Sequence, residues 1–279
     1  MNNIVNNCAV VHDICGIGRA ALSTIIPIMS IMECEVSLLP TMVLSSHTGG
    51  FGYPAKIDLS EYMKEHLDHW KSINPYFNGI YIGYIPSIKE GKVVKEFIDT
   101  FKKEETILLV DPILGDQGKI YSGLSKENIT MIRDIISKAN IITPNYTEAA
   151  LLLNEEYKES ISLKQIVSMG ERLLSYNLDS VVITSVPLEN KARDANVFVM
   201  DRKGSYKVMS TPYIGGGYPG TGDAFTSIVL ASVLKGLTVY EGVSKAMNFI
   251  CEVIRNIEIL GDYDSIRGIP IEKYLKNLI

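Results

Sequence analysis

Short runs of apolar residues alternate with longer amphipathic segments along most of this chain. The short runs are typical of buried β-strands, and the longer segments repeat their apolar positions at helical spacing. This alternation predicts strand–helix–strand units, in which the strands lie parallel and the crossovers are right-handed. We therefore predict an α/β fold in three layers, with a central, mostly parallel β-sheet and helices on both faces.

The individual elements follow from this pattern. Strands are predicted at residues 8–11, 36–39, 42–44, 79–82, 106–110, 140–142 and 181–183. Helices are predicted at residues 19–32, 59–70, 87–101, 125–138, 147–153, 163–174, 221–235 and 240–257. Residues 196–200 and 206–210 are predicted to form an antiparallel hairpin, because turn-forming residues separate them. Since no linker or repeat interrupts the pattern, residues 1–279 are predicted to form a single domain.

Local signals refine three of these elements. Pro27 lies inside the first predicted helix and is expected to kink it. Ser87 and Ser125 stand where helix caps are expected, and Asn128 follows Ser125 at the spacing of a capping box. The Gly, Ser and Pro content of residues 45–54 predicts a loop.

Composition and charge narrow the functional class. The 279 residues are 46% hydrophobic and 21% charged, with a formal net charge of −5. This composition excludes a disordered chain, and the absence of a basic field argues against nucleic acid as a partner. The sequence has neither a signal-like start nor a long apolar run, and its four cysteines form no C-x-x-C motif. We therefore expect a cytoplasmic protein with reduced thiols and no membrane partner.

Polar residues come directly after several of the predicted strands. In open parallel sheets, ligands bind beyond the carboxyl ends of the strands. The residues at these positions are His12, Asp13, Ser45, Ser46, His47, Thr48, Gly83, Tyr84, Asp111, Asn145 and Thr184. This contrast between apolar strands and polar strand ends predicts a ligand site along one edge of the sheet.

The segment GGGYPGTGDA at residues 215–224 carries the strongest chemical signal. Glycines and a helix N-terminus present backbone N–H groups to an anion, so residues 220–222 are candidates for an anion hole. Asp223 stands at the helix start, where a carboxylate can take a proton from an attacking hydroxyl. The alternative is a glycine turn in which Asp223 is only an N-cap.

Two further segments offer oxygen ligands. Asn145 and Glu148, in TPNYTE, suit a hydrated Mg²⁺ beside phosphate oxygens, although they also suit a simple capping box. Asp111 and Asp116, in VDPILGDQG, would need a cation between them and a polyphosphate. The alternative for Asp111 is an Asp-Pro turn at a strand end.

Two loops and one tyrosine are candidates for holding a small substrate. The loop that begins at Asp13 is rich in glycine, but it matches neither the P-loop nor the complete dinucleotide motif. The loop of His47, Thr48 and Gly49 offers a hydroxyl and an imidazole, and Tyr84 can stack on a flat ring. For each of these residues a purely structural role remains the alternative.

Together these motifs resemble the ribokinase-like superfamily, and in detail its pyridoxal, pyridoxamine and pyridoxine (vitamin B6) kinases. The resemblance covers nearly the whole chain and rests on seven motifs in one order. They are DICGIG at 13–18, SSHTG at 45–49, GY at 83–84, VDPILGD at 110–116, ITPNYTE at 142–148, VVITS at 181–185 and GTGDAF at 220–225. The resemblance implies ATP-dependent phosphorylation of the 5′-hydroxymethyl group of a B6 vitamer.

The resemblance also implies a role for each matching residue. Asp223 would be the catalytic base. The implied anion hole consists of Gly220, Thr221 and Gly222. The implied ATP-binding residues are Asp111, Asp116, Asn145, Glu148, Thr184 and Thr221. Of these, the residues implied to hold Mg²⁺, partly through water, are Asp111, Asp116 and Glu148. The implied substrate-binding residues are Asp13, His47, Thr48, Gly49, Tyr84 and Asp223.

The implied cofactors are ATP and Mg²⁺, with a monovalent cation such as K⁺ left open, and the implied assembly is a homodimer. Three departures keep alternatives open. Asp13 stands where these kinases often have Ser. The carboxylate of Asp13 would favour a substrate with a cationic amine or a protonated ring nitrogen. Ser46 replaces the usual Asn, and the glycine-rich segment before GTGD resembles hydroxymethylpyrimidine kinases. A hydroxymethylpyrimidine kinase, a dual-specificity small-alcohol kinase and a non-catalytic B6-binding protein therefore remain alternatives.

Overall fold

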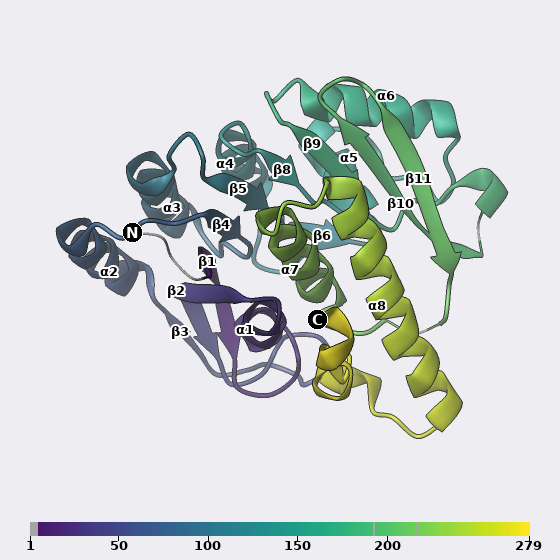
Figure 1. Cartoon of the computed structure of the whole chain (residues 1–279), viewed down its shortest axis with the longest axis horizontal. Coiled ribbons are helices and arrows are strands. Elements are labelled where there is room, and N and C mark those ends of the chain that lie inside the picture. The colour runs from purple at the N-terminus through teal and green to yellow at the C-terminus, as the bar shows by residue number, and fades with distance from the viewer. Residues whose placement is uncertain (1–4, 192, 216) are drawn as a thin grey trace.

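A computed structural model describes residues 5–191, 193–215 and 217–279 (Figure 1). Gly216 of the glycine-rich segment lies outside the described residues. The strands are β1 (Asn6–Cys15), β2 (Cys34–Leu44), β3 (Lys56–Asp58), β4 (Gly79–Ile82), β5 (Ile107–Val110), β6 (Gly115–Asp116), β7 (Lys119–Ile120), β8 (Ile141–Ile142), β9 (Ser180–Ile183), β10 (Asp194–Asp201) and β11 (Tyr206–Pro212).

Nine of these strands form one twisted sheet in the order β11-β10-β9-β8-β5-β4-β1-β2-β3. The six strands from β9 to β2 in this order pair in parallel, whereas β10, β11 and β3 are antiparallel to their neighbours. The predicted mostly parallel sheet is therefore confirmed. The remaining strands, β6 and β7, form a separate two-stranded hairpin.

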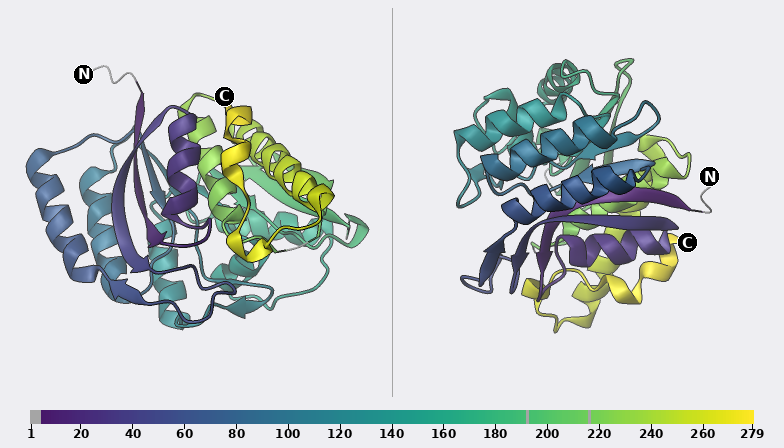
Figure 2. Two further views of the ribbon diagram at one scale, coloured as in Figure 1. Left: turned by 90° about the horizontal axis from the view of Figure 1, so that it is seen from below. Right: turned by 90° about the vertical axis from the view of Figure 1, so that its left-hand side faces the viewer.

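Helices cover both faces of the sheet, as Figure 2 shows. They are α1 (Leu22–Ile31), α2 (Ser60–Ile73), α3 (Ile88–Phe101), α4 (Lys126–Ile136), α5 (Tyr146–Leu153), α6 (Leu163–Leu174), α7 (Thr221–Leu234) and α8 (Val239–Leu260). One apolar core joins α2 to α6 with the sheet, and a second joins α1, α7 and α8 with its other face. Successive residues of β1 point to opposite faces of the sheet, so Ala9 packs in the first core and Val10 in the second. This arrangement confirms the predicted three layers.

The structure lengthens several predicted elements and adds others. β4 and α6 have the predicted bounds, and Ser125 and Asn128 form the predicted capping box of α4. The two predicted segments around Pro40 are one continuous strand, β2. Pro40 is tolerated because β3 pairs only with residues 42–44 of β2, which leaves the proline N free of a ladder bond on that side. β3, β6 and β7 were not predicted, because runs of two or three residues carry no apolar signal.

A β-bulge interrupts the pairing of β1 with β2 between His12 and Ile14. A bulge inserts an unpaired residue and re-aims the side chains beside it. Here His12 and Asp13 are both buried, and their side chains meet instead of pointing to opposite faces. Among the described residues, no helix is long and apolar enough to cross a membrane.

Candidate active site

The carboxyl ends of the parallel strands and the N-terminus of α7 meet at one edge of the sheet. His12 of β1 contacts Asp223 of α7, and Asp111 after β5 accepts a hydrogen bond from Thr226 of α7. Asn145 after β8 pairs with Thr184 after β9 through a parallel bridge. The sequence-predicted residues from four strands and one helix therefore lie along the edge where ligands of such sheets bind.

The N-terminus of α7 presents backbone groups that no side chain caps. Gly220 is the N-cap residue, and its φ of 77° lies in the left-handed region that favours glycine. An added Cβ there would lie 1.9 Å from the carbonyl oxygen of Arg19. Five other helices, α3, α4, α5, α6 and α8, are capped by side chains. The backbone N–H of Thr221 donates to the Tyr218 carbonyl at 3.3 Å, and the N–H groups that follow it suit the anion hole that the sequence predicts.

Asp223 lies in the first turn of α7, and its carboxylate contacts residues outside its own helix. Oδ2 accepts a hydrogen bond of 2.7 Å from the backbone N–H of Ala21, and Oδ1 lies 3.1 Å from Nε2 of His12. The interpretation of Asp223 as an N-cap is therefore wrong, because Gly220 occupies that position. The side chain is mostly buried, with 12% of its surface exposed. A buried and oriented carboxylate of this kind is suited to act as a general base.

His12 was listed among the strand-end residues, but no specific role was predicted for it. Its Nδ1 lies 2.8 Å from Oδ1 of Asp13, so the ring stands between two carboxylates. The thiol of Cys15 donates to Oδ2 of Asp13 at 3.3 Å. Although burial opposes ionisation, the hydrogen bond and charge of His12 lower the pKa of Asp13. The only sequence signal for His12 was its place beside Asp13 at a strand end.

Asp111 is buried between β4 and α7. Its Oδ2 accepts hydrogen bonds from the hydroxyl of Thr226 at 3.2 Å and from that of Tyr81 at 3.5 Å. Burial, followed by the charge of Asp223, raises the pKa of Asp111 to about 7. The crowding of these two carboxylates makes the region favourable for a cation.

Asn145 and Glu148 form a reciprocal capping box at the start of α5. The backbone N–H of Glu148 donates to Oδ1 of Asn145 at 2.9 Å, and the backbone N–H of Asn145 donates to Oε2 of Glu148 at 2.8 Å. The capping alternative is thus what the structure adopts. The same two side chains also hold the preceding loop, because Leu114 N–H donates to Oε1 of Glu148 and Asn145 Nδ2 donates to the Gly115 carbonyl.

Four of the acidic residues of the site affect the phenol of Tyr121. Burial is the main cause that raises its pKa, and the charges of Glu148, Asp116, Asp111 and Asp223 raise it further. Tyr121 directly follows β7 and was not predicted as a site residue.

The predicted metal residues do not form a direct ligand set. Among the described residues, no three Asp, Glu, His or Cys side chains form a group that could hold a metal ion. Asp116 is exposed, and its Oδ1 accepts from the next backbone N–H. Burial and the charge of Asp111 raise the pKa of Glu148 well above its usual range, so this pair carries repulsion that a cation would relieve. The donor chemistry therefore fits a Mg²⁺ ion that keeps most of its water ligands.

The predicted substrate residues lie on the β1 side of Asp223. Burial, followed by the charge of Asp13, raises the pKa of Tyr84. Both ring nitrogens of His47 form hydrogen bonds: Nδ1 accepts from the Gly49 N–H, and Nε2 donates to the Ile266 carbonyl. Thr48 and Gly49 are exposed next to it. His47 thus supports the loop, while Thr48 and Gly49 remain open to a ligand.

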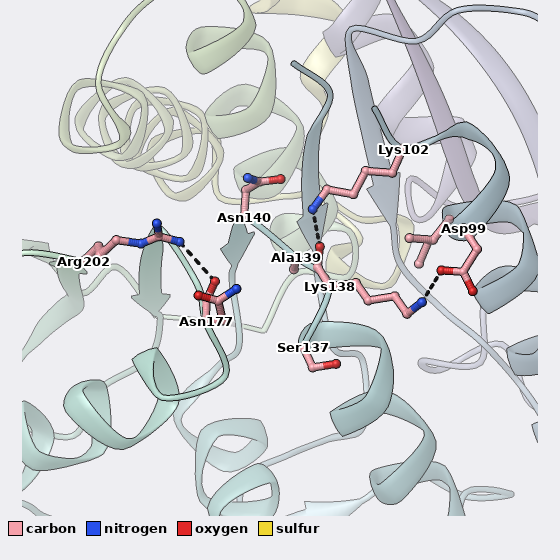
Figure 3. Close-up of a pocket in the computed structure, with 9 residues that line it drawn as sticks. Asp99, Lys102, Ser137, Lys138, Ala139, Asn140, Asn177 and Arg202 are labelled. Atoms are coloured by element: carbon pink, nitrogen blue, oxygen red, sulfur yellow. Dashed lines mark hydrogen bonds and ion pairs between the residues drawn. The ribbon is translucent and has the colours of Figure 1, made fainter. Parts of the chain in front are cut away.

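A separate cavity of about 390 Å³ lies at the opposite edge of the sheet (Figure 3). Its lining includes Asp99, Lys102, Lys138 and Arg202. Each cation already has a partner: Lys102 donates to a backbone carbonyl, Lys138 pairs with Asp99, and Arg202 pairs with Asp179. Because this cavity borders the amino ends of β8 and β9, it is remote from the predicted residues.

The fold and the site define a small-molecule kinase of the ribokinase-like superfamily. Residues 74–265 match the phosphomethylpyrimidine kinase family, and the chain belongs to this family. A hydroxymethylpyrimidine/phosphomethylpyrimidine kinase from Aquifex aeolicus is 30% identical over 188 residues, which are 66% of this chain and 69% of that protein. The sequence-based recognition of the superfamily is thereby confirmed.

Two solved structures are similar over nearly their whole length. A phosphomethylpyrimidine kinase homologue from Bacteroides thetaiotaomicron is 36% identical, with a TM-score of 0.94, and covers 100% of this chain and 95% of its own. A second crystal form of that homologue contains pyridoxal. Pyridoxal kinase from Lactobacillus plantarum is 26% identical, with a TM-score of 0.90, and covers 98% of this chain and 96% of its own.

Proposed function

We propose that this protein transfers the γ-phosphoryl group of ATP to the 5′-hydroxymethyl group of a B6 vitamer: pyridoxal, pyridoxamine or pyridoxine. The observation that carries the proposal is the buried Asp223 carboxylate beside the uncapped N-terminus of α7. The similar structure that contains pyridoxal supports a B6 vitamer as the substrate class. Pyridoxal kinase from Lactobacillus plantarum, which shares this fold, supports the same assignment.

In the proposed reaction, Asp223 accepts the proton of the substrate hydroxyl as its oxygen attacks the γ-phosphorus. The bond between the γ-phosphorus and the bridging oxygen of ATP breaks, and ADP leaves. The backbone N–H of Gly222 would stabilise the charge on the transferred phosphoryl group, and that of Thr221 would join it by exchanging the Tyr218 carbonyl for a phosphate oxygen. Because such transfer needs little covalent assistance, positioning and charge stabilisation account for most of the catalysis.

ATP phosphates would lie between α7 and the strand ends that carry Asp111, Asn145 and Thr184. Asp111 and Glu148, with Asp116 at the edge, would hold Mg²⁺ through its water ligands. When bound, the ion would offset the negative charge of the phosphates and of these carboxylates. The proposal leaves open a monovalent cation such as K⁺.

The substrate ring would lie beside β1, between Asp13 and Tyr84, with Thr48 and Gly49 at the open side. Both oxygens of Asp13 already have partners, since Oδ1 contacts His12 and Oδ2 accepts from Cys15. A cationic amine at Asp13 would therefore join an existing network rather than meet a free carboxylate. This observation weakens the expectation that Asp13 alone selects an amine-bearing vitamer.

The second candidate function is a hydroxymethylpyrimidine kinase, and the family match together with the Aquifex aeolicus relative supports it. Both activities would use the same phosphate residues, so only the substrate side distinguishes them. The test is side-by-side turnover of pyridoxal, pyridoxamine, pyridoxine and hydroxymethylpyrimidine with MgATP. The proposal expects the highest kcat/KM with a B6 vitamer. Higher kcat/KM for hydroxymethylpyrimidine would support the second candidate, and no alcohol-dependent ATP consumption would indicate a binding protein.

We further propose a cytoplasmic homodimer, as the resemblance to B6 kinases implies. The support is the resemblance alone, so the assembly needs its own measurement. Light scattering coupled to size exclusion should give twice the chain mass of 30.9 kDa. A mass equal to one chain would contradict the dimer without affecting the proposed activity.

A further inference from the structure

The imidazole ring of His12 stands between two carboxylates that come from distant parts of the chain. Nδ1 lies 2.8 Å from Asp13 Oδ1, and Nε2 lies 3.1 Å from Asp223 Oδ1. The His12 side chain is only 3% exposed. The ring therefore links the strand that carries Asp13 to the helix that carries the proposed base, in a place that bulk water does not reach.

The geometry favours a cationic ring. A neutral imidazole has one N–H and one lone pair, so one of its nitrogens would face a carboxylate oxygen with a lone pair. A protonated ring carries an N–H on each nitrogen, one beside Asp13 and one beside Asp223, although the N–H on Nε2 is not aligned with the Asp223 oxygen. Burial opposes this charge, but the hydrogen bonds and charges of the two carboxylates outweigh it and raise the pKa of His12 to about 10.

Other ionisable groups around the ring come from β4 and from the loop after β5. The ring of Tyr81 meets His12 edge to face, with 6.0 Å between the ring centroids. Asp111 also feels the charge of His12, which opposes the rise in the pKa of this carboxyl group. With Asp13 and Asp223, these groups place three carboxylates and one phenol around a single imidazole.

The surrounding backbone makes room for the ring in this position. A Cβ on Gly83 would lie 2.0 Å from Cδ2 of His12, so only glycine fits there. The bulge in β1 brings Asp13 to the ring, where its backbone N–H, at 2.9 Å, and its Oδ1, at 2.8 Å, both face Nδ1; the first contact suits a lone pair on Nδ1 and the second an N–H. Nε2 makes no aligned hydrogen bond, so its contact with Asp223 is that of an ion pair.

We propose that His12 is a positioning residue that joins Asp223 and Asp13 in one ionic bridge, and so holds the base in the orientation that takes the substrate proton. The proposal rests on the function proposed above, because it treats Asp223 as the base. The Ala21 N–H fixes one oxygen of Asp223, and His12 fixes the other. Together the two contacts leave the carboxylate little freedom to rotate.

Steady-state kinetics of His12→Gln across pH provide the first test. The assay uses whichever of the four alcohols the wild type phosphorylates best, so a wrong vitamer assignment does not affect it. We expect kcat to fall about 10- to 100-fold, as when outer-shell partners of metal ligands are removed, with KM for ATP unchanged. His69→Gln, on exposed α2, is the matched control with wild-type kinetics.

The pH profile separates positioning from a merely structural role. Wild-type kcat should fall as the pH rises through about 10, where His12 loses its proton, and this limb should be absent in His12→Gln. Asp13→Asn removes one partner of the ring, so its alkaline limb should appear at lower pH. A His12→Gln variant with the wild-type kcat and the wild-type alkaline limb would overturn the proposal.

Nitrogen NMR of the histidine rings gives a test that needs no turnover. The chain has four histidines, and His12→Gln assigns the signal of interest. We expect both nitrogens of His12 to be protonated at neutral pH. A neutral His12 ring at that pH would overturn the proposal even if the wild type is an active B6 kinase. Conversely, a wild type without any kinase activity would refute the proposed function and the role of Asp223, whatever the ring signal shows.

Discussion

The backbone N–H of Ala21 donates a hydrogen bond of 2.7 Å to the carboxylate of Asp223, which lies 202 residues further along the chain. Ala21 adopts a φ of 55° and a ψ of −141°, a conformation that costs free energy in any residue with a side chain. Such strain persists where the surrounding structure over-determines it. The relationship ties the loop after β1 to the helix that would carry the base.

The glycines at the start of α7 should respond differently to the same substitution. Gly220→Ala places a methyl group against the Arg19 carbonyl at positive φ and should destabilise the fold by at least about 1–3 kcal/mol. Gly222→Ala meets no atom within 4 Å and should retain or slightly raise stability, by up to about 1 kcal/mol. If residues 220–222 form the anion hole, Gly222→Ala should nevertheless raise KM for ATP. Thermal unfolding and ATP titration measure both effects, and an unchanged KM would argue against the anion hole.

Glu148 in the capping box of α5 and Glu241 in that of α8 allow a role in the site to be distinguished from helix capping alone. Glu148→Gln leaves either the Asn145 N–H or the Leu114 N–H without its acceptor, and should cost about 1–3 kcal/mol of stability. It should also reduce turnover, because the loop before the β6–β7 hairpin loses its anchor. Glu241→Gln disrupts the corresponding box with Thr238 on α8, away from the site. This control should keep full kcat, and equal losses of activity in the two variants would contradict the assignment.

Asp111 should make the metal-free protein less stable as the pH rises. Its pKa is about 7 in the folded protein against 3.8 in its ordinary environment, so the folded state binds the proton more tightly. The contribution of Asp111 to the free energy of unfolding is therefore largest below about pH 4, and it is lost as the pH rises to about 7. Asp111→Asn should flatten this decline in thermal unfolding, whereas Asp68→Asn on exposed α2 should not. An identical pH slope in wild type and Asp111→Asn would refute the shift.

Long apolar segments allowed most of the fold to be predicted from the sequence. β4 and α6 were predicted at their observed bounds, because each has a strong apolar pattern between clear turn or cap signals. β1 extends beyond its predicted core of residues 8–11, since pairing with β2 recruits polar residues that carry no strand signal. β3 exists only through its pairing with β2, so no local pattern could reveal it.

The site was predicted in part for the same reason. Asp111, Asn145 and Thr184 were found because they follow apolar strands whose ends meet at one edge. His12 was placed at this edge, but its role was not predicted, because it depends on a bulge in β1 and on α7 packing against that strand, which no local pattern shows. Tyr121 was missed because it lies in a loop whose position is set by contacts with α5. The sequence alone could not decide between capping and metal binding for Glu148, and the structure shows that both its oxygens accept backbone hydrogen bonds.

The most direct test of the account is the initial rate of pyridoxal 5′-phosphate formation from pyridoxal and MgATP by wild type and by Asp223→Asn. The amide keeps an oxygen for the Ala21 N–H but cannot take the substrate proton. The account predicts product formation by the wild type and a loss of about 10²–10⁴-fold in the variant, with the fold intact by circular dichroism. Wild-type turnover in Asp223→Asn, or no phosphorylation of any B6 vitamer by the wild type, would contradict it.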